Sequence, residues 1–320
     1  MPELFRIDVH HHALRSDTPA SREAFLKSAP DFAWTLDWKP EDAIRTMDEG
    51  GCQTAINSQP GGAKHPDPAQ AAHMAREMND RGAKLVQDFP GRFGQFATLP
   101  LPHIDESLRE MEYAVNVLNV DGFCLTSNFG DTWPGDPIYA PVMDELNRRK
   151  AVVFFHPAAP NACLSMVPGV PVHFIELPAD TARCAVSLLY SGTLKRCPDI
   201  KFILAHGGGA LPALSHRIAS LAKARPSLLE IVPYGDPVRA LGDFYFEITS
   251  ALNPSAYGAL RSLVQPSQLL FGTDCPFRTS AQEAAALDEL NIDPAERLAL
   301  EQTNAQRLFP RFAQAAAVTR

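Results

Sequence analysis

The feature that most constrains the fold of this chain is a set of apolar, β-like runs that end on histidine or aspartate. Several of these polar residues precede a turn: His156 is followed by Pro157, and His206 by three glycines. The carboxyl ends of parallel strands in a barrel meet at one rim, so side chains placed there are expected to converge. The polar residues are His10 and His12 at the end of the first run, then His156, His206 and Asp274.

Short runs rich in β-branched and aromatic residues alternate with helix-like segments along the chain. Such alternation favours parallel pairing, and eight units close into a (β/α)₈ barrel. An open doubly wound sheet has less support, because no G-x-G-x-x-G motif follows the first run. The sequence therefore predicts an α/β fold of the TIM-barrel type, with residues 1–320 as a single domain. The predicted strands are residues 4–9, 54–58, 93–99, 122–126, 151–156, 202–206, 244–249 and 269–273, and the predicted helices are residues 68–87, 104–118, 140–149, 180–194, 211–222, 254–263, 281–290 and 294–308.

Two segments do not fit this alternation. Residues 16–39 precede the first helix and carry Trp34 and Trp38, and residues 157–177 follow His156 and are rich in proline and apolar side chains. Long loops after barrel strands lie over the carboxyl-terminal mouth. Both segments are therefore expected to be lids over a substrate, although an insertion with only a packing role is the alternative.

The bulk properties exclude several classes of partner. The net charge of −8 and the pI of about 5.7 argue against binding to nucleic acid or to an anionic membrane. No apolar stretch is long enough to span a bilayer, and the residues after Met1 do not resemble a signal peptide. The six cysteines form no C-x-x-C pair, which favours a reducing cytoplasm over a disulfide framework.

The histidines and the aspartate at the strand ends have the composition of a metal site. Side chains alternate along a strand, so Asp8, His10 and His12 should share one face and His11 the other. Neutral imidazoles suit Zn²⁺ or Mn²⁺, and His156 with Asp274 would complete the ligand set and leave a position open. Asp8 could orient a ligand from the layer below.

His206 has two interpretations. It is either a fifth ligand or an unligated general acid and base, and the second is favoured. The predicted fourth strand carries no lysine that could become a carbamylated bridge between two metals, so one metal ion is expected.

With these motifs in place, the sequence resembles the amidohydrolase superfamily, and within it the aminocarboxymuconate-semialdehyde decarboxylase-like family. The segment 180–217 is most similar to enzymes of the 6-methylsalicylate decarboxylase type. The matching stretches span nearly the whole chain in the order of the family, and they are residues 7–12, 121–128, 136–139, 155–157, 202–212 and 269–277.

The resemblance implies a metal-dependent, non-oxidative carboxy-lyase with one Zn²⁺ or Mn²⁺ ion. The ligands would be His10, His12, His156 and Asp274, and His206 would act in catalysis together with Asp274. The substrate would be a small unsaturated or aromatic carboxylic acid, and the aromatic acid would be salicylate-like if it carries an ortho hydroxyl. By analogy with similar enzymes, a homodimer or higher homo-oligomer is expected. Residues expected to contact the substrate are Phe277 and Trp133 as aromatic walls, Arg278 at its carboxylate, and His173 in the second lid.

Two other functions remain open. A mononuclear hydrolase such as a lactonase would use the same metal and histidine to activate water against a carbonyl. A barrel that has lost activity and serves as a binding module is disfavoured, because all five polar residues at the strand ends are present.

Overall fold

The computed structural model describes residues 3, 5–12, 22–23, 26–27, 30–164 and 166–313, and these contain the predicted barrel. Eight parallel strands form one sheet in which each strand pairs with its neighbour in sequence. Between the last strand and the first, Val9 N donates to Phe271 O at 3.0 Å and His11 bridges to Cys275. The strands are β1 (Arg6–His11), β2 (Cys52–Asn57), β3 (Phe93–Thr98), β4 (Gly122–Thr126), β5 (Val152–His156), β6 (Lys201–Leu204), β7 (Tyr245–Glu247) and β8 (Leu269–Leu270).

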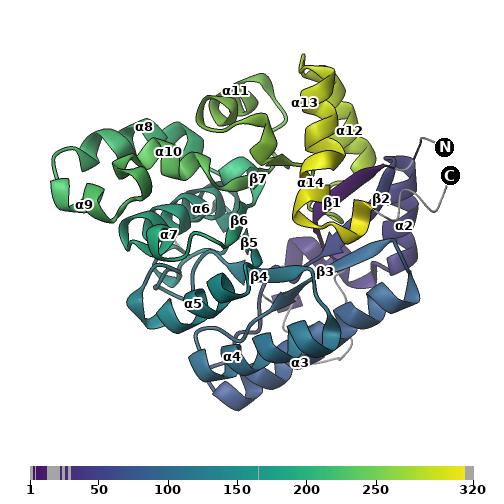
Figure 1. Ribbon diagram of the computed structural model, residues 1–320. Coiled ribbons are helices and arrows are strands. Elements are labelled where there is room, and N and C mark those ends of the chain that lie inside the picture. Colours follow the sequence, from purple (N-terminus) through teal and green to yellow (C-terminus); the bar gives the residue numbers. More distant parts are fainter. Residues whose placement is uncertain are drawn as a thin grey trace.

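Helices surround the strands (Figure 1). The predicted start of the first long helix is confirmed, since the Asp67 side chain accepts a hydrogen bond from Gln70 N at 3.0 Å and Pro68 follows it. Within the described residues, no helix is long and apolar enough to cross a bilayer. The α-helices are α2 (Pro40–Glu49), α3 (Pro68–Asp88), α4 (Ile104–Tyr113), α5 (Ala140–Arg148), α6 (Val172–Tyr190), α7 (Thr193–Arg196), α8 (Leu211–Ala222), α9 (Pro226–Ile231), α10 (Pro237–Gly242), α11 (Pro254–Leu263), α12 (Ser280–Glu289), α13 (Pro294–Leu298) and α14 (Asn304–Leu308).

The second lid is shorter than predicted. The helix expected from residue 180 begins at Val172, so the end of the segment 157–177 is helical. Pro178 lies inside this helix, and a proline in a helix interior removes a backbone hydrogen bond. However, α6 runs through Pro178, and buried side chains spaced one turn apart hold it against the barrel, namely Glu176, Asp180, Cys184 and Leu188.

The first lid is described only in part. Its residues from Pro30 to Asp37 form the 3₁₀ helix η1, and most of the rest of the segment 16–39 lies outside the described residues. The short helices α9 and α10, between α8 and β7, were not predicted.

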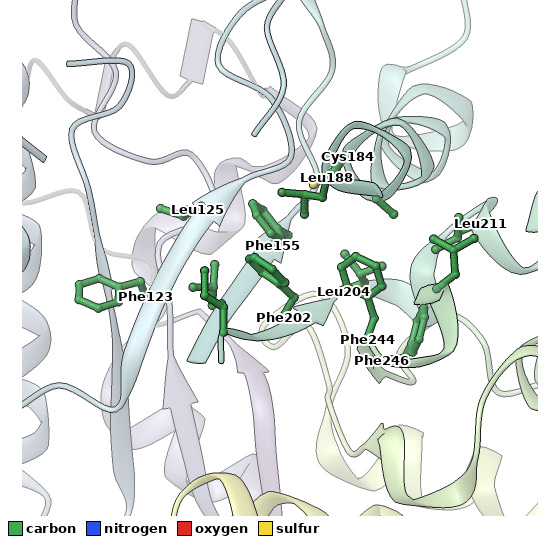
Figure 2. Close-up of a cluster of buried hydrophobic side chains, with 14 of the residues drawn as sticks. Phe123, Leu125, Phe155, Cys184, Leu188, Phe202, Leu204, Leu211, Phe244 and Phe246 are labelled. Carbon is green, nitrogen blue, oxygen red and sulfur yellow. The ribbon is translucent and has the colours of Figure 1, made fainter. Parts of the chain in front are cut away.

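A hydrophobic layer joins the strands to the helices outside them (Figure 2). Phe155 and Phe202 stack with ring centroids 5.6 Å apart, and Phe246 is fully buried nearby in the same cluster. Cys184 and Leu188 bring α6 onto this layer. Large buried aromatic side chains each contribute a few kcal/mol to stability, so this layer fixes α6 over β5 and β6.

A second cluster fills the barrel interior below its carboxyl-terminal rim. Phe96 and Phe154 stack with centroids 5.8 Å apart, and the Phe154 ring lies 4.9 Å from the His10 ring. The interior is therefore a packed apolar plug, as in other barrels of this type. The Phe154 ring therefore packs against the imidazole of His10 from inside the barrel.

Candidate active site

Four polar side chains converge at the rim of the barrel. The Nε2 atoms of His10 and His12 lie 3.0 Å apart, and each is 3.1 Å from Asp274 Oδ1. His156 joins them, because one ligand atom from each of the four residues lies within 4.8 Å of the other three. The structure thus brings together all four ligands predicted from the sequence.

The hydrogen bonds behind the imidazoles determine which nitrogen faces this centre. His10 Nδ1 donates to Glu247 Oε1 at 2.8 Å, His12 Nδ1 to Ser58 O at 3.1 Å, and His156 Nδ1 to Pro157 O at 3.0 Å. An acceptor at Nδ1 keeps the proton on that nitrogen and leaves the Nε2 lone pair free to bind a metal.

The donor set fits one divalent ion. Metal–nitrogen bonds of about 2.1 Å place two ligands at right angles about 3.0 Å apart, which matches the spacing of His10, His12 and Asp274. Asp274 Oδ1 is buried and has no hydrogen-bond partner among the described residues. Its nearest polar neighbours are the Nε2 atoms of His10 and His12, both at 3.1 Å, and a cation bound between these three atoms would compensate the buried charge.

Charges at the centre shift the pKa values of these groups in opposite directions. Burial opposes the charge on His10, yet the carboxylates of Asp274 and Glu247 raise its pKa to about 10. Burial lowers the pKa of His12, and burial with the neighbouring imidazoles holds that of His156 well below its usual value. Without a metal, His10 therefore holds a proton in the place where a cation would bind, and the other two imidazoles are neutral.

Unusual backbone conformations position the site. His206 and Asp274 have φ angles of 56° and 58°, in the left-handed region that non-glycine residues seldom adopt. Gly272 leaves room for its neighbours, because a Cβ there would lie 2.3 Å from Glu247 Oε2. The turn predicted at the glycines after His206 is present, since Gly209 has a φ of 57°, and a Cβ on Gly209 would lie 2.3 Å from Pro178 O.

His206 stands beside the four ligands. Its Nε2 atom contacts Asp274 Oδ2 at 3.2 Å, and its ring centroid is 5.0 Å from that of His10. It is absent from the group of four whose donor atoms converge, and instead forms a separate group of three with His10 and Glu247. Glu247 is already bonded to His10 Nδ1 and to the His206 backbone, on the side away from the four ligands. This position suits an unligated acid or base better than a fifth ligand.

Glu247 is the functional residue that sequence reasoning missed. Its side chain is fully buried, and besides His10 it accepts hydrogen bonds from the backbone N–H groups of His206 and Thr249. The sequence signal that could have revealed it is a single carboxylate, Glu247, at the end of the aromatic strand β7. Because Glu247 contacts both His10 and the His206 backbone, it connects the ligand set to the candidate proton donor.

Asp8 does not share a face with His10 as expected. Its Oδ2 atom lies 3.1 Å from His11 Nδ1 and accepts from Thr273 Oγ1 at 2.6 Å. The register between β1 and β2 shifts between Asp8 and His11, and such an irregularity re-aims side chains. Asp8 Oδ1 accepts a hydrogen bond from the backbone N–H of His10 at 3.0 Å. Asp8 therefore stabilises the backbone of β1 and does not orient the imidazole of His10.

Aromatic side chains from three distant segments meet beside His12. The Phe277 ring lies 6.4 Å from the His12 ring and 4.9 Å from Phe32 in η1. The ring of His173, in the first turn of α6, also packs against Phe32, with the ring centroids 5.5 Å apart. Phe277 and His173 therefore belong to one aromatic wall, in which Phe32 was not predicted.

The other two expected substrate contacts have partners of their own. Trp133 Nε1 donates to Asp180 Oδ1 at 2.9 Å, and Arg278 Nε donates to Glu283 Oε1. Burial raises the pKa of Glu283 to about 7, against the opposing effect of Arg278. The structure brings neither Trp133 nor Arg278 into ring contact or hydrogen bonding with the four ligands among the described residues.

Comparison with known proteins agrees with this geometry. The family model described as Amidohydrolase matches residues 7–311. The chain belongs to the amidohydrolase family. The match includes every residue of the converging site and all eight strands apart from Arg6, the first residue of β1.

Relatives of this amidohydrolase-family protein include named decarboxylases. Decarboxylase yanB of Aspergillus niger is 36% identical, over 96% of this chain and 88% of its own. The 6-methylsalicylic acid decarboxylase of Penicillium expansum is 34% identical, over 97% of both chains. A dihydroxybenzoic acid decarboxylase from Polaromonas, solved with bound manganese and 2-nitroresorcinol, shares the fold with a TM-score of 0.82, at 24% identity and 97% coverage of each chain.

Replacing Glu247 by Gln should weaken metal binding. A neutral amide removes the charge behind His10 and presents an N–H group to one of the three N–H donors. We expect the affinity for Mn²⁺ or Zn²⁺, measured by calorimetric titration of metal-free protein, to fall about 10- to 100-fold. The control is Glu301→Gln, since Glu301 is also buried but pairs with Arg6 at 2.8 Å, away from the ligands. Equal affinities in the two variants would contradict the role of Glu247.

Glu283 should make stability depend on pH. Its pKa in the folded protein, about 7, exceeds the ordinary value of 4.5, so the folded state retains a proton that the unfolded state loses between these values. The free energy of unfolding should therefore fall as pH rises from 5 to 8, by on the order of 2 kcal/mol. Urea unfolding of Glu283→Gln should lack this component, whereas Glu289→Gln, on the exposed side of the same helix, should retain it.

Proposed function

We propose that this protein is a metal-dependent decarboxylase that releases CO₂, without a redox step, from a small aromatic acid of the salicylate type. The observation that carries the proposal is the convergence of His10, His12, His156 and Asp274 in a group that could hold one metal ion, with His206 Nε2 3.2 Å from Asp274 Oδ2. Relatives named as decarboxylases over 96–97% of the chain support the reaction class. Unsaturated acids with a comparable conjugated carboxylate form the wider substrate class.

His10, His12, His156 and Asp274 would hold the divalent ion. When bound, the ion supplies positive charge that orients the acid and stabilises the negative charge developing in the transition state. Mn²⁺ and Zn²⁺ are the candidate ions, and a dihydroxybenzoic acid decarboxylase of the same fold that was solved with bound manganese supports Mn²⁺.

His206 would supply the proton that replaces the carboxylate. The proton is transferred to the ring carbon that carries the carboxylate, the bond between these two carbons breaks, and its electron pair restores the ring as CO₂ leaves. Asp274 Oδ2 orients the imidazole for this transfer. Phe277 and Phe32 exclude water beside His12, which strengthens the electrostatic interactions and favours an uncharged product.

Replacing His206 by Asn should abolish most of the activity and leave the metal in place. The loss of a positioned acid typically costs 10²- to 10⁴-fold in kcat. Release of CO₂ and formation of the phenol from salicylate-type acids would be measured, with metal content determined in parallel. His216→Asn, at an exposed position on α8, is the matched control. Turnover of lactones or esters, with no CO₂ from any aromatic acid, would favour a hydrolase instead.

Metal binding should depend strongly on pH. Because the pKa of His10 is about 10 in the metal-free site, the ion displaces one proton throughout the neutral range. The apparent affinity for Mn²⁺ should therefore fall about tenfold for each unit by which the pH is lowered below that value. Titrations of metal-free protein in buffers between pH 6 and 8 would test this, and reconstitution with Mn²⁺ or Zn²⁺ would identify the ion that restores activity.

We also infer that the enzyme is a cytoplasmic homodimer or higher homo-oligomer built from a single barrel domain. The six cysteines are free and buried, as expected of a reducing compartment. Large apolar side chains on the second lid are exposed, and such a patch is typical of an interface between subunits. These residues are Leu164, Met166, Val167, Val170, Phe174 and Ile175. Light scattering coupled to gel filtration would give the subunit number.

A further inference from the structure

The barrel closes at an irregular seam between its last strand and its first. The strand β8 spans only Leu269–Leu270, and both of its residues pair with β7. Beyond β8 the chain runs beside β1, where Asp274 N donates to His10 O at 2.8 Å and His12 N donates to Cys275 O at 2.7 Å. The ligands His10 and His12 therefore lie on one side of this seam and Asp274 on the other. The geometry of the seam sets the distance of 3.1 Å between each Nε2 atom and Asp274 Oδ1.

The side chain of Asp8 bridges this seam with hydrogen bonds. Its Oδ1 atom accepts from the backbone N–H groups of His10 at 3.0 Å and Thr273 at 3.1 Å. Its Oδ2 atom accepts from Thr273 Oγ1 at 2.6 Å and lies 3.1 Å from His11 Nδ1. Asp8 is fully buried, so water does not compete for these bonds. Both oxygens of Asp8 thus bind the residue that directly precedes Asp274.

Thr273 extends the network to the other side of Asp274. Its Oγ1 atom donates to Asp8 Oδ2 and accepts a hydrogen bond from the backbone N–H of Cys275 at 3.1 Å. The bonds from Thr273 to Asp8, together with the bond from Cys275 to Thr273 Oγ1, are named the Asp8–Thr273 clasp below. Because the clasp includes both residues that flank Asp274, it restricts the backbone on either side of this ligand.

Asp274 needs such a restriction, because its backbone has a disfavoured conformation. Its φ of 58° lies in the left-handed region, which residues other than glycine adopt only where the surrounding structure holds them there. In this conformation Oδ1 faces the imidazoles of His10 and His12, and Oδ2 lies 3.2 Å from His206 Nε2. Relaxation of the backbone would move both oxygens away from these partners.

We propose that Asp8 and Thr273 are positioning residues for the metal centre, and that they hold Asp274 in the conformation that binds the ion and orients His206. Asp8 is outside the group of four donors, so its effect on the ion is transmitted through the backbone of Thr273 and Asp274. This inference rests on the ligand set of the proposed function, and it is independent of the reaction that the site performs.

Thr273→Val tests the clasp directly. Valine has nearly the same shape as threonine but no hydroxyl, so Asp8 Oδ2 loses a donor and the N–H of Cys275 loses its acceptor. We expect the affinity of the metal-free protein for Mn²⁺, measured by calorimetric titration, to fall about tenfold or more, as is typical when groups that support metal ligands are replaced. Thr273→Ser restores the hydroxyl and should recover most of the loss.

Thr54→Val is the matched control. Thr54 is also buried in a strand and loses one hydroxyl bond on substitution, since its Oγ1 donates to Gly91 O at 2.8 Å. It lies in the first half of β2, before the chain reaches the rim. Both valine variants should be less stable to urea, but only Thr273→Val should bind Mn²⁺ more weakly. Equal Mn²⁺ affinities in the two variants, or an affinity in Thr273→Ser as low as in Thr273→Val, would overturn the proposal.

The absorption spectrum of bound Co²⁺ would show whether the Asp274 carboxylate moves. Co²⁺ reports the number and geometry of its ligands, and Asp274→Ala provides the spectrum of a site without this carboxylate. At saturating Co²⁺, the visible spectrum of Thr273→Val should shift towards that of Asp274→Ala, whereas Thr54→Val should retain the wild-type spectrum. A wild-type spectrum in Thr273→Val would contradict displacement of Asp274.

Asp8→Asn tests the clasp from the side of β1. The amide replaces one carboxylate oxygen by an N–H donor, which then faces other donors, so Mn²⁺ affinity should fall here too. Because the two residues act as one unit, the double variant Asp8→Asn/Thr273→Val should bind Mn²⁺ about as well as Thr273→Val alone. Losses that multiply in the double variant would show independent effects and contradict the clasp. If Thr273→Val does not fold, wild-type Mn²⁺ affinity in Asp8→Asn would overturn the proposal by itself.

Activity measurements separate this inference from the proposed function. Weakened Mn²⁺ binding in Thr273→Val, with no decarboxylation of any acid by the wild-type protein, would overturn the proposed function and leave the clasp standing. Decarboxylation of a salicylate-type acid by the wild-type protein, with unchanged Mn²⁺ affinity in Thr273→Val and Asp8→Asn, would overturn the clasp alone.

Discussion

The structure depends on one electrostatic constraint, the burial of three imidazoles and two carboxylates around a single point at the barrel rim. His10, His12 and Glu247 are completely inaccessible, and Asp274 keeps an oxygen with no hydrogen-bond partner among the described residues. In a low-dielectric environment, such groups are costly unless a charge compensates them. A proton on His10 provides partial compensation, and a divalent cation would provide more. The cost of this arrangement is offset by the apolar layers on both faces of the strands.

Rigid strands and variable loops have different roles at the site. Strand ends and their hydrogen bonds fix the imidazoles, as Glu247 does for His10 and the Ser58 carbonyl for His12. The residues expected to contact the substrate lie instead in and beside the lids, where Phe32 packs against both His173 and Phe277. Asp180 connects the two parts, because it lies on α6 and binds the loop after β4. Such a division is common where a barrel serves many reactions through variable loops.

Sequence reasoning was most successful where a pattern is local and repeated. The eight strands were predicted in order, and the helix limits at residues 211–222 and 254–263 agree with α8 and α11. It was less successful where tertiary packing overrides a local signal. The helix predicted from residue 180 begins at Val172, and its buried side chains carry it through Pro178. Alternation along β1 placed Asp8 beside His10, but a shift in strand register placed it beside His11.

The sequence by itself determined the ligand types and the strand ends that carry them, because the period of apolar runs sets the barrel and the rim follows from parallel pairing. Only the tertiary structure decided which groups support them. Glu247 is 237 residues from His10 in the chain, and Asn128 is 52 from Asp180, so no local pattern could reveal these pairs. Hydrogen bonds between distant strands and loops depend on how the barrel closes and on the path of each loop. These are properties of the packed molecule, and they determine the tautomers of the three imidazoles and the proton on His10.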